Sequence, residues 1–152
     1  MKRLIKKGFT IIELLVVILI IGILVGIAIP HIVGIQEQAN ITKAEAELRL
    51  LETGIESVYV NSKPNAYPAS STTICDTTLN SESPLIVAEI LYDPFRTSAE
   101  YNYILSTNGR YYVAFSYGPD GAADITGIGN TGVIAGTNDD DIFATNGDGT
   151  FA

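Results

Sequence analysis

The chain has 152 residues, with 17 Asp and Glu against nine Lys and Arg, which gives a formal net charge of −8. This acidic balance argues against nucleic-acid binding as the main task, since a phosphate backbone demands a basic face. Solubility and cation binding are both open as reasons for the acidity. The single cysteine, Cys75, excludes an intrachain disulfide.

The first eight residues form a basic leader that holds four of the nine cationic side chains: Lys2, Arg3, Lys6 and Lys7. An apolar run from Phe9 to Ile29 follows. As a helix this run would be about 30 Å long, which matches the hydrocarbon core of a bilayer. The positive-inside rule then places the leader in the cytoplasm and the chain after Pro30 on the outer side.

One carboxylate, Glu13, interrupts the apolar run. An acidic side chain at that depth is costly in lipid, so it needs a functional reason. A secretory signal peptide, with small residues at Gly26 and Ala28, is one alternative. A plain signal anchor is another, and Glu13 disfavours both. It also remains open that Glu13 only reaches the interface and has no specific role.

The stretch Lys7-Gly8-Phe9-Thr10-Ile11-Ile12-Glu13-Leu14-Leu15, followed by Gly22 and Pro30, resembles the N-terminus of type IV prepilins and type II secretion pseudopilins. In that family a membrane-embedded prepilin peptidase cuts after the glycine and methylates the new terminal amine. The resemblance implies processing between Gly8 and Phe9. It also implies that Glu13 serves assembly by pairing with the Phe9 amine of a neighbouring subunit, because an unpaired buried charge is so unfavourable.

A helical pattern continues beyond the membrane run. Apolar or small side chains recur at steps of three to five residues, as on one stripe of an amphipathic helix: Ile32, Ile35, Ala39, Thr42, Ala46, Leu50, Leu51, Ile55 and Val58. We therefore expect one helix from Phe9 to about Tyr59. Its second half should pack on a sheet of the same chain.

The segment after this helix is harder to assign. Asn61 to Ser83 is rich in Ser, Thr, Asn and Pro and predicts a long loop, with short structure near Ile74 to Leu79. Ser83-Pro84 is typical of a helix start, so we expect a short helix over Leu85 to Tyr92.

A hairpin is the clearest β signal. Glu100–Ser106 and Arg110–Tyr117 alternate in polarity and flank Thr107-Asn108-Gly109, whose Asn-Gly pair suits a tight turn. Further strands are expected at Gly132–Ala135 and Asp141–Thr145, inside a tail that is rich in Gly, Asn and Asp.

The second half resembles the major pseudopilin of type II secretion in four segments that follow the same order: Asp93-Pro94-Phe95, Tyr101-Asn102-Tyr103, Ser116 to Gly121 and Asp139 to Ile142. Phe95 stands where that family has tryptophan. In that family the last loops hold one calcium ion, which takes oxygen ligands. The matching positions are Ser116, Asp120, Asp139 and Asp141, with Asp124 as a further candidate. The alternative is that these aspartates are solvated turn residues.

Together these features predict an α+β, pilin-like fold, in which a long N-terminal helix with a membrane half and an amphipathic half packs on a small antiparallel sheet. The expected parts are a leader (1–8), a transmembrane and assembly helix (9–30) and a periplasmic or extracellular domain (31–152). No enzyme is predicted, since the only histidine, His31, abuts the membrane end and Cys75 has no histidine nearby.

The predicted function is that of a structural subunit in a type IV pilus-like filament or a type II secretion pseudopilus. Its partners would be further copies of itself, prepilin peptidase and the inner-membrane assembly platform, with no nucleic acid. It would lie in the bacterial inner membrane before assembly, and then in the pilus or the periplasmic pseudopilus. No cofactor is required, and calcium is the one addition that the resemblance implies. The alternative is a minor pilin that acts as a membrane-tethered binding module in adhesion or DNA uptake.

Overall fold

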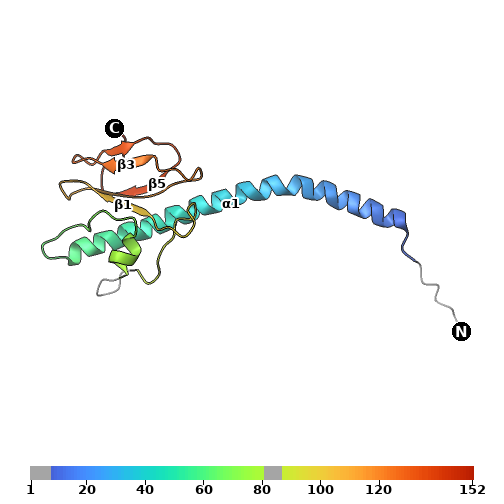
Figure 1. Cartoon of the computed structure of the whole chain (residues 1–152), viewed down its shortest axis with the longest axis horizontal. Coiled ribbons are helices and arrows are strands. Elements are labelled where there is room, and N and C mark those ends of the chain that lie inside the picture. The colour runs from blue at the N-terminus through green and yellow to red at the C-terminus, as the bar shows by residue number, and fades with distance from the viewer. Residues whose placement is uncertain (1–7, 81–86) are drawn as a thin grey trace. The chain divides into compact units, whose positions relative to one another are not determined.

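The computed structural model describes residues 8–80 and 87–152 (Figure 1). It divides into a unit that ends at Gln38 and a second unit, Ala39–Ala152. Helix α1 (Ile11–Asn61) belongs to both units. The predicted single long helix is confirmed, and its bounds differ from the expected ones by about two residues at each end.

In the first unit, every large apolar side chain from Phe9 to Ile29 is exposed. α1 is long and apolar enough in this part to cross a membrane. The helix continues through Pro30. These side chains have no partner within the described chain, which is what a lipid-facing or subunit-facing helix requires.

α1 ends where its last carbonyl groups find a side-chain partner. Ser62 donates its backbone N–H to the Val58 carbonyl at 2.9 Å and its hydroxyl to the Tyr59 carbonyl at 3.0 Å. Pro64 follows, and because proline has no N–H it cannot extend the helical ladder.

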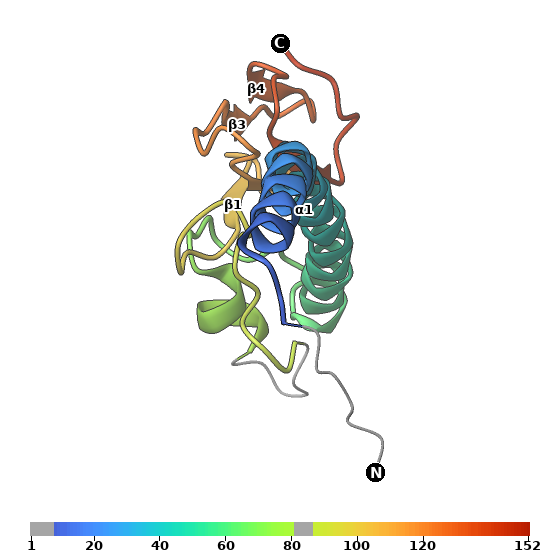
Figure 2. The same ribbon diagram turned by 90° about the vertical axis from the view of Figure 1, so that its right-hand side faces the viewer.

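The second unit is built around a three-stranded antiparallel sheet, in the order β1 (Asn102–Leu105), β2 (Tyr112–Ser116), β5 (Ile142–Thr145). β1 and β2 form the predicted hairpin, with Asn102 opposite Phe115 and Leu105 opposite Tyr112. A separate two-stranded sheet is formed by β3 (Ile125–Ile128) and β4 (Ile134–Gly136). Figures 1 and 2 show how these elements are arranged in the second unit.

The central strand β2 is buried on both faces. Tyr112 and Ala114 belong to the core that α1 forms with the sheet, whereas Val113 and Phe115 belong to a second core with β3 and β4. The helix contributes five buried side chains to the first core at steps of three or four: Ala44, Leu48, Leu51, Ile55 and Val58. The α+β, pilin-like fold is therefore confirmed.

Tyrosines also link the sheet to α1 by hydrogen bonds. The Tyr101 hydroxyl donates to Glu47 at 2.6 Å. The hydroxyls of Tyr67 and Tyr112 both donate to Glu56, at 3.0 and 3.2 Å. Each ring thus lies against apolar atoms while its hydroxyl reaches a carboxylate at the side of the helix, which is how a buried tyrosine satisfies its polar end.

Two expectations for the connecting segments have different outcomes. Structure near Ile74 to Leu79 is confirmed as one turn of π-helix, η1 (Cys75–Leu79). The helix over Leu85 to Tyr92 is wrong for its described part, since Val87 to Tyr92 are not helical, and Ser83-Pro84 lie outside the described residues. Tyr92 instead forms a bridge to Glu100, because pairing with the sheet and burial of Val87 outweigh the local helix signal.

Asp93, which precedes the hairpin, is hydrogen-bonded to the end of β2. This side chain is only 1% exposed. Its carboxylate accepts hydrogen bonds from the Ser116 hydroxyl (2.7 Å), the Phe95 N–H (3.0 Å) and the Tyr117 N–H (3.0 Å). The bonds from Ser116 and Tyr117 join the Asp-Pro-Phe segment to the C-terminal end of β2, and we call this contact the Asp93 clasp.

We expect Asp93→Asn to destabilise the unit Ala39–Ala152 by about 1.5–3 kcal/mol. The asparagine NH2 group would replace a carboxylate oxygen that accepts a hydrogen bond, so two donors would face each other and one would lose its acceptor. Urea unfolding measures this. Glu89→Gln, at an exposed position, is the control and should change stability by less than about 0.5 kcal/mol. Equal stability of the two variants would contradict the clasp.

Candidate functional site

The start of α1 carries a reciprocal cap. The Thr10 N–H and hydroxyl both donate to Glu13 Oε2, at 2.9 and 2.7 Å, and the Glu13 N–H donates to the Thr10 hydroxyl at 3.3 Å. This is a capping box, which satisfies otherwise free N–H groups at a helix start. Sequence reasoning missed Thr10, although the spacing Thr-x-x-Glu was visible.

The two residues predicted to flank the processing cut lie just outside the helix. Gly8 and Phe9 precede α1, both are exposed, and the Phe9 side chain is 75% exposed. The peptide bond between them is therefore accessible in the isolated chain. Glu13, one turn into α1, has its carboxylate turned back toward this end through its bonds to Thr10.

A second candidate site lies where two loops of the second unit meet. The segment after β2 carries Asp120 and Asp124, and the segment before β5 carries Asp140 and Asp141. The Asp120 N–H donates to Asp140 at 2.8 Å. The N–H groups of Asp124 and Ile125 donate to one oxygen of Asp141, at 2.8 and 2.7 Å. The pairing of β5 with β2 brings these loops together.

The approach of the two loops depends on Gly118. Its φ is +65°, and a Cβ at this position would lie 2.3 Å from the Asp140 carbonyl oxygen. A side chain would therefore clash with backbone as well as strain residue 118. Glycine at this position lets the two acidic loops touch.

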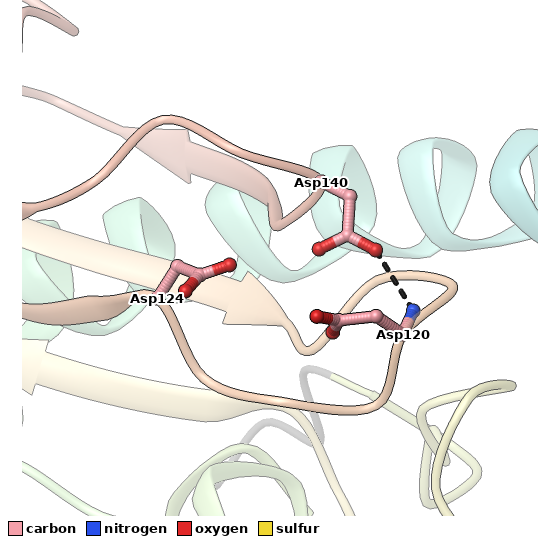
Figure 3. A group of neighbouring side chains, drawn as sticks. All are labelled: Asp120, Asp124 and Asp140. Carbon is pink, nitrogen blue, oxygen red and sulfur yellow. Dashed lines mark hydrogen bonds between the residues drawn. The ribbon is translucent and has the colours of Figure 1, made fainter.

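Three carboxylates converge at this point (Figure 3). One oxygen from each of Asp120, Asp124 and Asp140 lies within 4.8 Å of the others. Buried oxygens without a hydrogen-bond partner occur on Asp124, Asp140 and Asp141 among the described residues. Asp141 is only 8% exposed. Orphaned buried acceptors need an explanation, and this oxygen-only set fits a hard cation, so the cluster could bind a metal.

The electrostatics of the cluster favour a cation. The pKa of Asp124 is raised by burial and by the charges of Asp120, Asp139 and Asp140. Burial also raises the pKa of Asp141, and the two backbone N–H bonds oppose that rise. The only ion pair among the described side chains joins Lys43 and Glu47, so no cationic side chain balances these aspartates. Ionised, they repel one another.

The predicted metal ligands divide into two groups. Asp120 and Asp124 come together, with Asp141 beside them. The Ser116 hydroxyl is engaged by Asp93, and Asp139 is exposed and outside the convergent group. Asp140, which sequence reasoning had not named as a ligand, takes part instead. Three successive aspartates gave no signal to choose between Asp139 and Asp140, because the choice depends on loop geometry.

Cys75 offers no second chemistry. It is fully buried in the core on α1. Burial raises the pKa of its thiol to about 11, so the thiol is protonated at neutral pH and is a poor nucleophile.

Comparison with known proteins covers both units of the chain. The prokaryotic N-terminal methylation motif matches residues 3–29. The type II secretion system core protein G of Escherichia coli K12 is 32% identical over 142 residues, 89% of this chain and 88% of that protein. The chain belongs to the type II secretion system core protein G family. The core protein G of Dickeya chrysanthemi is 27% identical over 143 residues, 88% of this chain and 91% of that protein.

A fimbrial protein of Pseudomonas aeruginosa is 43% identical over 58 residues, 38% of each chain. No solved structure matches. The predicted family is therefore confirmed, as is the function at the level of a structural filament subunit of the pilin and pseudopilin class. The interpretation that the chain is not an enzyme is confirmed with it.

Proposed function

We propose that this chain is the repeating subunit of a type II secretion pseudopilus. The observation that carries the proposal is the extent of similarity: core protein G relatives match along nearly the whole chain, whereas the fimbrial protein of Pseudomonas aeruginosa matches over 58 residues. A minor pilin with a binding role has less support, because it would share the N-terminal helix and differ in the second unit.

Processing follows from the first unit under this proposal. Prepilin peptidase removes residues 1–8, and Phe9 becomes an N-methylated terminus. The mature chain then sits in the inner membrane through α1 until the assembly platform inserts it into the filament. Removal of four cationic side chains changes the formal side-chain charge from −8 to −12.

We expect mass spectrometry of the mature protein to give a chain that begins at Phe9 with one added methyl group. Gly8→Val should block the cut and leave the intact chain in the membrane, while Gly22→Ala, farther along α1, should be processed normally. A mature terminus at Ile29, or an unprocessed wild-type chain, would contradict the proposal.

Glu13 has two separable tasks in this arrangement. Its carboxylate caps α1 through Thr10, and its charge is available to the Phe9 amine of a neighbouring subunit. The cap needs an acceptor, which glutamine also provides. The pair needs the negative charge, because a cationic amine in a low-dielectric surrounding is stabilised mainly by an opposite charge.

Glu13→Gln should therefore insert stably into the membrane and be cleaved, yet fail to enter filaments, as should Glu13→Ala. Immunoblots of sheared filament and membrane fractions measure both. Glu37→Gln, at an exposed position of the same unit, should assemble like wild type. Normal filament yield from Glu13→Gln would show that the cap, not the charge, is the task of this residue.

The acidic loops hold calcium in this proposal. Asp120, Asp124, Asp140 and Asp141 would supply its oxygen ligands, and the ion would neutralise carboxylates that otherwise repel. A cation that binds only the folded unit stabilises it by mass action, by about 2.7 kcal/mol at a hundredfold excess over its dissociation constant. Magnesium demands a tighter octahedral cage and gives up its waters reluctantly, so it should act less.

Calcium should raise the melting temperature of the unit Ala39–Ala152 by several degrees relative to EDTA. The gain should shrink as pH falls, because the raised pKa values of Asp124 and Asp141 mean that protons displace the metal first at these groups, and protonation relieves the repulsion in the metal-free fold. Asp124→Asn and Asp140→Asn should abolish the calcium effect, whereas Asp148→Asn, outside the cluster, should retain it.

These substitutions avoid Asp141 for a structural reason. Its carboxylate also accepts two backbone N–H groups, so its loss would destabilise the metal-free unit as well. Identical wild-type melting curves in calcium and EDTA would make the cluster a set of turn residues.

A further inference from the structure

A groove runs along the second unit between α1 and β5. It has a volume of about 570 Å³ and is lined by Glu45, Leu48, Arg49 and Glu52 of the helix and by residues 141–145 of the strand. Leu48 is buried, and Ile142 and Ala144 pack against the helix-side core. The groove therefore has an apolar floor and a charged rim.

β5 presents an unpaired edge to this groove. It pairs with β2 on one side and is the last strand of its sheet. Among the described residues, no backbone hydrogen bond outside the β2 ladder involves residues 142–145. The strand contains neither a charged residue nor proline, the usual devices that protect a free edge. The strand has only four residues, which limits the edge it offers, and a partner segment in the groove would cover what is left.

The rim is predominantly acidic. Glu45 and Glu52 contribute two carboxylates and Arg49 one guanidinium, a net formal charge of −1. The Asp141 carboxylate is turned away to the N–H groups of Asp124 and Ile125 and is not counted. Arg49 has no ion pair in the part of the chain that the structure describes. A partner segment should therefore combine a cation with an apolar side chain.

The chain itself offers such a segment at the end of α1. Val60 is 69% exposed, and Lys63, Pro64, Asn65 and Ala66 are exposed after it. Lys63 has no ion pair with any described residue, whereas Lys43 pairs with Glu47 and Arg96 stacks on the Tyr117 ring at 4.1 Å. A free cation thus lies three residues from an exposed aliphatic side chain.

Lys63 of this segment cannot reach Glu45 in the groove of its own chain. Residues 45 and 63 lie 18 positions apart, most of them in α1, which amounts to about 25 Å at 1.5 Å per residue. A contact between them must join two copies, and it uses different surfaces on each copy. Such a head-to-tail contact is heterologous, and it propagates as an open filament wherever the rotation between copies does not close a ring.

We infer that residues 60–66 of one copy dock in the α1–β5 groove of a second copy, with Val60 on the apolar floor and Lys63 between Glu45 and Glu52. The docked segment covers the free edge of β5. This inference rests on the proposed filament function and adds to it a contact outside the membrane helix. The carboxylates of the groove would repel an acidic partner, whereas the Lys63 segment of a second copy brings a positive charge to them.

Cysteine cross-linking in the full chain tests the contact. Glu45→Cys combined with Lys63→Cys should give a ladder of covalent oligomers when assembled filaments are oxidised, because each copy offers both halves of the contact. Either substitution alone should give no ladder. The pair Glu45→Cys and Arg110→Cys is the matched control, since Arg110 is another exposed cation that pairs with no acidic side chain in residues 8–80 and 87–152. Native Cys75 is buried and stays out of the reaction. Filaments that form without the ladder would overturn the inference.

Charge reversal covers the case in which the cysteine pair does not assemble. Lys63→Glu should lower filament yield severalfold, as should Glu45→Lys with Glu52→Lys, and the triple combination should restore it. Arg110→Glu should assemble normally. If Lys63→Glu and the groove double variant each assemble as wild type, the contact is absent. If the wild-type chain forms no filament, the proposed function itself fails, which is a separate outcome.

Discussion

Burial of β2 on both faces is the constraint on which the second unit depends. Its alternate side chains serve two different cores: Tyr112 and Ala114 pack toward α1, and Val113 and Phe115 pack toward β3 and β4. A shift of one residue in the register of β2 would exchange the two sets and place a tyrosine hydroxyl in the wrong core. Glu56 fixes this choice, because the Tyr112 hydroxyl finds its acceptor only on the helix side.

β2 also positions the acidic cluster, because the first acidic loop begins directly after the C-terminal end of this strand. Ser116, the last residue of β2, donates a hydrogen bond to Asp93. The chain then turns at Gly118 into the first acidic loop. On its other edge β2 pairs with β5, and Asp141 immediately precedes that strand. The acidic cluster is thus a consequence of strand pairing, since neither loop contains a complete set of ligands. The groove on α1 arises from the opposite edge of β5.

Local signals in the sequence predicted those parts of the structure that local physics decides. Asn108-Gly109 marked the hairpin, and the apolar spacing marked α1 to within about two residues. β3 was missed because Ile125-Thr-Gly-Ile128 has too few residues to show an alternation of polar and apolar side chains. The strand forms because it pairs with β4, which is distant from any local signal in those four residues. The helix over Leu85 to Tyr92 was wrong because burial of Val87 and the bridge at Tyr92 outweigh a start signal. Asp140 could not be chosen over Asp139 without the loop contact that turns its carboxylate inward.

The acidic cluster also has an energetic meaning that bears on the whole unit. Raised pKa values for Asp124 and Asp141 mean that the folded, metal-free unit holds these groups ionised less readily than the unfolded chain does. At neutral pH the cluster therefore opposes folding, even though Asp141 stabilises the start of β3 through two N–H bonds. In the proposed calcium-bound state, the ion offsets this contribution because it neutralises the carboxylates. Under the calcium proposal, the closure of the two loops, and with it the position of β5 beside the groove, is strongest only where the ion is available.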